Sequence, residues 1–233
     1  MEKIEYKLPE GSVLCLRTCN ENLRSHGNFQ WKAKGLVKCD DWSEAAECGQ
    51  GLHGLLWGSG NGELLDWSEN AKWLVVEVSA KATVDLGGKV KFPQGKVVYC
   101  GDRLTATEFI AALSPEGTVV VGRTATAGYR GTATAGYRGT ATAGDGGTAT
   151  AGDRGTATAG YEGTATAGYE GTATAGDGGT ASAGDGGIIS IRYWDNRSSR
   201  WRVKILYPGE DGIESGVLYS VDSNGSPVKK EGA

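Results

Sequence analysis

The sequence predicts a mainly β protein: a β-solenoid of four coils, capped by an N-terminal α+β domain and a small C-terminal β unit. Three observations predict this fold. Residues 124–187 form eight uninterrupted octads, each close to T-A-T-A-G-(Y/D)-(R/E/G)-G. Threonine and alanine alternate within each octad, which is the pattern of a short strand with two different faces. The flanking segments, 1–123 and 188–233, hold all the tryptophan, cysteine and histidine of the chain and have an ordinary globular composition.

The N-terminal domain, residues 1–123, is expected to mix strands with short helices. Dense β-branched residues bounded by glycine or proline predict its strands. These strands are expected at 11–17, 73–80, 96–101 and 117–122. Helices are expected at 42–48 and 106–113, with one helical turn at 68–72.

Each octad of the repeat is expected to form one strand and one turn. In Thr-Ala-Thr-Ala, both threonines lie on one face and both alanines on the other. An antiparallel meander would leave an alanine face that nothing in the repeat covers. A solenoid with two octads per coil instead buries two alanine faces against each other. We therefore expect four 16-residue coils, about 4.8 Å apart, with alanine inside and the stiff, hydroxyl-bearing threonine outside.

The Gly-x-x-Gly segment of each octad is expected to form the turn, with its glycines supplying the positive φ angles. The sixth octad position adds a second period, because two octads with tyrosine are followed by two with aspartate. With two octads per coil, each edge of the solenoid then alternates tyrosine and aspartate. The eight residues are Tyr129, Tyr137, Asp145, Asp153, Tyr161, Tyr169, Asp177 and Asp185.

The C-terminal segment, residues 188–233, is expected to form a small β unit. Its strands are predicted at 188–194, 200–207 and 216–222, with a turn at 195–199. Because the open ends of a solenoid expose strand edges, we expect this unit and the N-terminal domain to cap the stack.

Charge and composition argue against several partners. The formal net charge of −4, of which the repeat carries −3, offers no basic stripe for a phosphate backbone, so nucleic-acid binding is not expected. No apolar run is long enough to span a membrane, and the N-terminus lacks a signal-peptide core. We expect a cytoplasmic protein, in the host cytoplasm if a phage encodes it, with its five cysteines reduced.

No group of residues predicts catalysis, a metal site or a cofactor. The cysteines show no established zinc-binding spacing with His53, and we expect them to be structural. They are Cys15, Cys19, Cys39, Cys48 and Cys100. His53 is expected to be packed or hydrogen-bonded, and nothing fixes Asp66, Glu69 and Glu77 as an acid pair. The repeat aspartates are too few for calcium coils, and the glycines follow no phosphate-loop pattern.

The stretch AGYRGTATAGYRGTATA, residues 127–143, resembles the repeats of bacterial ice-nucleation proteins, whose 16-residue coils carry an AGYGSTxTA-like motif. The resemblance covers 124–187 and implies a β-solenoid whose Thr-x-Thr rows organise ice-like water. The threonines that carry it are Thr124, Thr126, Thr132, Thr134, Thr140, Thr142, Thr148, Thr150, Thr156, Thr158, Thr164, Thr166, Thr172 and Thr174. The last octad departs from the motif with Thr180 and Ser182. Four coils fit ice binding better than ice nucleation.

In that family a continuous tyrosine ladder implies dimerisation. Here tyrosine is absent from every second coil, so any homo-oligomer is expected to form through the two interrupted tyrosine edges. These edges contain Tyr129, Tyr137, Tyr161 and Tyr169.

The layout of the whole chain is similar to an uncharacterised family common in phages and prophages. Its members carry a C-G-x-G-L-H-like element, here residues 48–53, followed by octad repeats and a short C-terminal β unit. The stretch VDLGGKVKFPQGKVVYCG, residues 84–101, fits that N-terminal module too. The family implies no established activity.

Two non-enzymatic functions follow from these patterns. One is a surface binder whose threonine rows engage ice or ordered water, since no charge interrupts the threonine face. The other is a phage-encoded protein that inhibits or sequesters a host component, with the solenoid as a docking rod or spacer. An enzyme within residues 1–123 has only His53 and scattered carboxylates in its favour.

Overall fold

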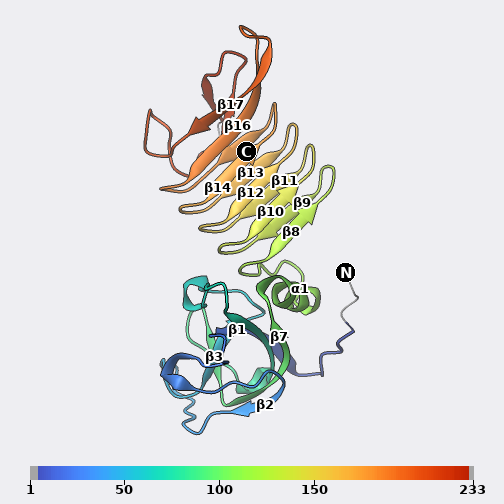
Figure 1. Ribbon diagram of the computed structural model, residues 1–233, viewed down its shortest axis with the longest axis vertical. Coiled ribbons are helices and arrows are strands. Elements are labelled where there is room, and N and C mark those ends of the chain that lie inside the picture. The colour runs from blue at the N-terminus through green and yellow to red at the C-terminus, as the bar shows by residue number, and fades with distance from the viewer. Residues whose placement is uncertain (1–4, 231–233) are drawn as a thin grey trace. The chain divides into compact units, whose positions relative to one another are not determined.

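The computed structural model describes residues 5–230, which form two compact units that meet in the chain between Val121 and Gly122 (Figure 1). The second unit contains both the repeat and the C-terminal segment. The three-segment division of the sequence, and the capping of the solenoid by the N-terminal domain, stay predictions.

The first unit is built on a seven-stranded sheet in the order β2-β7-β4-β1-β3-β6-β5. Its strands are β1 (Ser12–Cys19), β2 (Gly35–Lys38), β3 (Leu52–Leu56), β4 (Lys72–Ser79), β5 (Val84–Asp85), β6 (Val90–Phe92) and β7 (Gln94–Gly101). All pairings in this sheet are antiparallel, with β1 between β3 and β4. One buried cluster of this unit is formed largely by valine and cysteine side chains, among them Cys15 and Val76, and it includes Trp31.

One α-helix, α1 (Arg103–Leu113), occurs in the described part of the chain. It begins after Asp102, whose carboxylate accepts a hydrogen bond from the Thr105 backbone N–H at 2.9 Å and so caps the helix. Ala106, Phe109 and Ile110 form its buried face. The helix is neither long nor apolar enough to cross a membrane. Three short 3-10 helices complete the unit, at His26–Asn28, Gly62–Leu64 and Ala80–Ala82.

Several sequence-based expectations for this unit were wrong. Residues 42–44 are irregular and 45–48 form bends instead of a helix, and residues 68–70 form only a hydrogen-bonded turn. Residues 117–122 form no strand although Val120 and Val121 are fully buried. The Val121 backbone N–H donates to the Gly58 carbonyl at 2.9 Å instead of joining a ladder. The shorter strands β2, β3, β5 and β6 were not predicted, because each is too short to show a clear pattern.

The repeat forms the four-coil solenoid that the sequence predicts. One sheet contains β8 (Thr124–Ala127), β10 (Thr140–Ala143), β12 (Thr156–Ala159) and β14 (Thr172–Ala175). The other contains β9 (Thr132–Ala135), β11 (Thr148–Ala151), β13 (Thr164–Ala167) and β15 (Thr180–Ser182). Neighbouring strands in each sheet are parallel and offset by one coil, so that Thr140 pairs with both Thr124 and Thr156. This register confirms two octads per coil.

Alanine fills the interior of the solenoid. The core alanines expose at most 8 % of their surface, and those of the middle coils, such as Ala149 and Ala157, expose none. The threonines that alternate with them lie outside and are exposed or half-buried. The predicted assignment of alanine inside and threonine outside is therefore confirmed.

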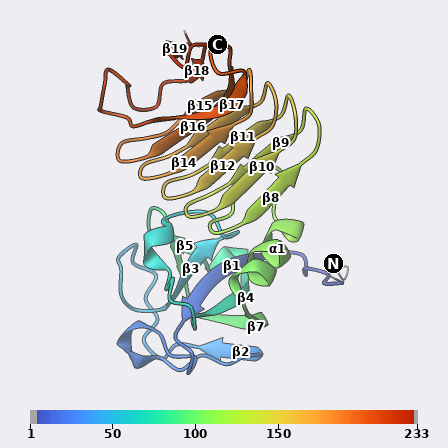
Figure 2. The ribbon, with the colours of Figure 1, turned by 45° about the horizontal axis from the view of Figure 1, so that its top comes forward.

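The C-terminal segment closes the end of the solenoid by changing both residue size and strand direction. Strand β16 (Ile188–Asp195) adds a fifth parallel rung, in which Ile189 and Ile191 replace the inward alanines. These larger side chains pack with Leu206, Ile213 and Tyr219 in the same core. Strand β17 (Arg200–Leu206) pairs antiparallel with β16, and β18 (Tyr219–Val221) and β19 (Pro227–Lys229) extend the other sheet (Figure 2). Strand β19 was not predicted, and β18 is shorter than expected.

Candidate functional site

The threonines predicted to bind lie in two outward-facing arrays, one on each sheet of the solenoid. The first array, on β8, β10, β12 and β14, consists of Thr124, Thr126, Thr140, Thr142, Thr156, Thr158, Thr172 and Thr174. The second, on β9, β11 and β13, consists of Thr132, Thr134, Thr148, Thr150, Thr164 and Thr166, continued by Thr180 and Ser182 on β15. Within an array, the threonines of a pair are about 6.7 Å apart along the strand and rungs repeat at about 4.8 Å. Each array is thus a regular grid of hydroxyl and methyl groups.

The two arrays differ at their C-terminal ends. In the second, the Thr164 and Thr180 hydroxyls lie 3.2 Å apart and share a hydrogen bond, and Ser182 donates to Thr166. Ser182 itself is only 2 % exposed. Within residues 5–230, no threonine of the first array forms a side-chain hydrogen bond with another threonine or serine of the repeat. Thr172 and Thr174 stay half-buried. The first array therefore keeps four complete Thr-x-Thr rungs accessible.

The turns of the repeat use glycine differently from the prediction. Positive φ occurs at the seventh octad position, which holds arginine or glutamate in five octads, for example Arg154 at 54°. The flanking Gly152 and Gly155 have no positive φ. They are required because the coils are close: a Cβ on Gly152 would lie 2.9 Å from the Tyr137 backbone nitrogen, and one on Gly155 would lie 2.8 Å from the Ala151 Cβ. The first and last glycines of each turn thus permit close stacking. The prediction that glycine supplies the positive φ holds in three octads, at Gly146, Gly178 and Gly186, and is wrong in the other five.

The edges of the solenoid alternate tyrosine and aspartate, as the register requires. The Arg130 backbone N–H donates to the Asp145 carbonyl at 2.9 Å, and Gly146 donates to that of Tyr161 at 2.7 Å. The Asp145 and Asp153 carboxylates each accept a hydrogen bond from a backbone N–H one coil further on, at Tyr161 and Tyr169, at 2.8 and 2.9 Å. These two aspartates therefore join successive turns.

Three of the four tyrosines on these edges are exposed, with 71 % of Tyr129, 51 % of Tyr161 and 49 % of Tyr169 accessible, and Tyr137 is half-buried. On one edge, Arg154 links three successive coils, since it pairs with Glu170 at 2.8 Å and donates to the Tyr137 hydroxyl at 3.2 Å. Self-association through the tyrosine edges stays a prediction.

The cysteine and histidine candidates lie in the first unit. All five cysteines are free, and Cys15, Cys19 and Cys39 are buried, as structural residues would be. The expectation of a structural role fails for Cys48, which is exposed and accepts a hydrogen bond from the Lys89 ammonium at 2.9 Å. That hydrogen bond lowers the pKa of Cys48. His53 is half-buried, which agrees with the expected packed histidine, but its Nε2 is buried without a hydrogen-bond partner in the described chain.

The remaining candidates do not form a site. Asp66 and Glu69 lie in a surface turn, whereas Glu77 lies on β4 and accepts a hydrogen bond from Tyr6. No group of three or more His, Cys, Asp or Glu side chains is placed to hold a metal ion within residues 5–230.

Comparison with known proteins finds two kinds of similarity. Residues 13–112 match a family described as a domain of unknown function, DUF7666. The chain is also similar to bacterial ice nucleation proteins. It is 36 % identical over 105 residues to ice nucleation protein InaU of Pantoea ananas, and this covers 44 % of the chain and 10 % of InaU. It is 40 % identical over 102 residues to an ice nucleation protein of Pseudomonas syringae, and this match covers 43 % of the chain and 9 % of that protein.

A third relative, the ice nucleation protein of Xanthomonas campestris pv. translucens, is 38 % identical over 105 residues, covering 44 % of the chain and 7 % of the relative. The chain thus spans a tenth or less of the length of these proteins. No solved structure matches it. The similarities and the fold support a repeat solenoid protein that resembles ice nucleation proteins, and nothing in them supports the phage association or a host-protein partner.

Proposed function

We propose that the protein is a non-enzymatic binder of ice or ordered water. The observation that carries this proposal is the first threonine array, in which four Thr-x-Thr pairs repeat in register on a single sheet with no charged side chain between them. The similarity to ice nucleation proteins supports the same conclusion.

The physical basis is the regularity of the grid. Parallel strands in register place chemically identical hydroxyls at one spacing along the coil axis and another along the strand. Each hydroxyl can donate one hydrogen bond and accept two, while the methyl groups between them bind no water. An array of this kind positions a layer of water molecules before any ice is present, which lowers the ordering cost of binding an ice surface.

We assign binding to the first array because its fourth rung is complete. The second array ends in Thr180 and the nearly inaccessible Ser182, and two of its hydroxyl pairs are hydrogen-bonded to each other. Hydroxyls that pair with one another have less capacity left for water.

The test compares two double variants with the same chemistry on opposite sheets. Thr156→Lys with Thr158→Lys disrupts the centre of the first array, and Thr148→Lys with Thr150→Lys disrupts the second. All four side chains lie outside the alanine core, so we expect each change to alter stability by no more than about 0.5 kcal/mol. Thermal hysteresis and ice-crystal shaping should fall sharply in the first variant and persist in the second. Equal activity of the first variant and the parent would contradict the assignment.

A further inference from the structure

An arginine on the core side of the first unit has no counter-ion in the structure. Along β1, Val13, Cys15, Arg17 and Cys19 alternate onto one face, and the three uncharged members of this series belong to the same hydrophobic cluster. Arg17 therefore occupies a position that strand alternation normally gives to an apolar residue. Within residues 5–230 it forms no ion pair, although removing a guanidinium from water is costly without one.

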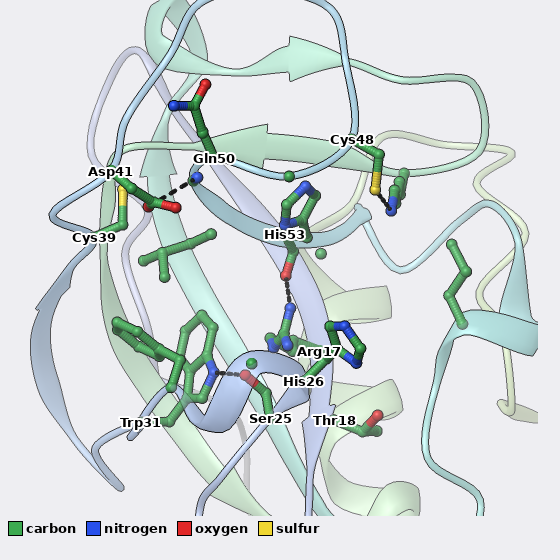
Figure 3. Close-up of a pocket in the computed structure, with 18 of the residues that line it drawn as sticks. Arg17, Thr18, Ser25, His26, Trp31, Cys39, Asp41, Cys48, Gln50 and His53 are labelled. Carbon is green, nitrogen blue, oxygen red and sulfur yellow. Dashed lines mark hydrogen bonds between the residues drawn. The ribbon is translucent and has the colours of Figure 1, made fainter.

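Neighbouring groups hold the Arg17 guanidinium in place. It lies 4.8 Å from the centre of the Trp31 ring, and its Nη1 donates to the His53 carbonyl at 2.6 Å (Figure 3). Trp31 is in turn fixed by a hydrogen bond from its indole N–H to the Ser25 hydroxyl at 3.0 Å. The Nε of Arg17 is buried without a partner, and its Nη2 makes no hydrogen bond to any described residue. The arginine is thus rigidly oriented with donor capacity unused.

Two further cations, Lys89 and Lys91, lie close enough to His53 to act on it together with Arg17. Desolvation, together with the charges of Lys89, Arg17 and Lys91, lowers the pKa of His53 to about 4, and Asp41 offsets this only in part. Lys91 is 1 % exposed, donates to the Glu47 carbonyl and lies over the Trp42 ring. None of these three cations pairs with a carboxylate in the part of the chain that the structure describes.

Arg17 lines a cavity of about 830 Å³ that lies entirely within the first unit. Phe29, Trp31 and Leu65 give it apolar surface, and Lys89 and the loop through Gly49 and Gly51 form part of its wall. Cys48 also lines it (Figure 3). Asp40 and Asp41 also line it, and neither is within ion-pair distance of Arg17. Cavities of this size, mostly apolar with a few oriented polar groups, are typical of small-molecule sites.

We propose that this cavity binds a small organic phosphate, with the phosphate paired to Arg17 and the rest of the ligand against Phe29 and Trp31. The planar fork of an arginine held at two points suits an oxyanion. A phosphate would supply the counter-ion that Arg17 lacks within the described residues. The C-G-Q-G-L-H element of residues 48–53 would then form part of the binding site, since it supplies both Cys48 and His53.

Cys48 reports on occupancy of this cavity in the full-length protein. It is exposed, lines the cavity and has a lowered pKa beside Lys89, so it should react readily with iodoacetamide. A bound phosphate would shield the thiol and weaken the effect of Lys89. We expect saturating inorganic phosphate, pyrophosphate or AMP to slow alkylation of Cys48 by roughly tenfold, and to raise the Tm of the first unit. Acetate serves as the carboxylate probe.

Two variants and a control decide the role of Arg17. Arg17→Met removes the charge but keeps the length, so it should abolish protection by phosphate without lowering the Tm of the unliganded protein. Arg17→Lys keeps the charge without the fork and should weaken protection. Lys96→Met removes an exposed cation on β7 that does not line the cavity, and it should behave as the parent.

The proposal is overturned if none of the three phosphate probes slows alkylation of the parent. Protection that persists in Arg17→Met would also overturn it, as would protection by acetate and not by phosphate. A lowered Tm of Arg17→Met, with no phosphate effect in the parent, would show that Arg17 is a structural residue. None of these outcomes depends on the threonine arrays.

Discussion

Replacing Ala157 with leucine should destabilise the solenoid strongly. Ala157 exposes none of its surface and lies between Ala141 and Ala173 in one column of the core. Because rungs are about 4.8 Å apart, the added carbons have no free space along the axis, and the opposite sheet blocks them across the coil. Overpacking of a rigid core costs about 1–3 kcal/mol or more. Since the solenoid has little room to relax, we expect about 3 kcal/mol, which lowers Tm by roughly 10–20 °C.

The assay is thermal unfolding followed by the β-sheet circular-dichroism signal, with two comparisons. Thr156→Leu adds a large apolar side chain at the neighbouring outward position and should change stability by no more than about 0.5 kcal/mol. Ile189→Ala is the opposite change, from a large to a small side chain, in the same column of the core, at the rung formed by β16. It should leave a cavity and lower the free energy of unfolding by about 2–5 kcal/mol. An unchanged melting temperature for Ala157→Leu would refute the packing argument.

Three further predictions follow from the fold. Deleting one coil, residues 140–155, should leave a folded protein. Deleting one octad, residues 140–147, should place β16 next to the sheet of β9, β11, β13 and β15 instead of its own sheet. Equal melting curves for the two deletions would contradict the two-octad coil. Glu162→Gly should stabilise the solenoid by up to about 1 kcal/mol, because residue 162 has a φ of 52°, and urea titration measures the gain. Between about pH 6.5 and 4 the unfolded chain protonates His53 and the native state does not, so stability should fall as pH is lowered through that window. The free energy of unfolding should fall by less than about 1.4 kcal/mol per pH unit, because water screens a half-buried ring. Urea titrations at pH 7 and pH 5 measure this fall, and it should be smaller in His53→Gln than in the parent.

The solenoid could be predicted from the sequence because one short pattern determines it. Alternation of threonine with alanine gives each short strand one polar and one apolar face. Because eight alanine faces must be buried, a solenoid with two octads per coil is favoured over an antiparallel meander. The detailed roles of Gly152 and Gly155 could not be predicted, because they depend on how closely neighbouring coils approach. The same is true of Ser182, whose burial follows from the non-local pairing of β15 with β18.

The first unit was harder to predict because its pairings are non-local and its strands are short. Residues 117–122 look like a strand, but Val120 and Val121 pack into the core without joining a ladder. The most informative missed signal is Arg17. In V-x-C-x-R-x-C, a charged residue replaces an apolar one on the inner face of a β-strand, and this departure from the alternation indicates a site.

The central claim, that the threonine solenoid binds ice, is tested most directly by the partitioning of the parent protein into a slowly growing ice shell. We predict that the protein becomes enriched in the ice fraction, and that ice crystals grown in its presence develop facets. A globular protein of similar size and charge provides the reference for exclusion. If the parent is excluded from ice to the same extent as that reference, and crystals grow unshaped, the threonine arrays do not bind ice.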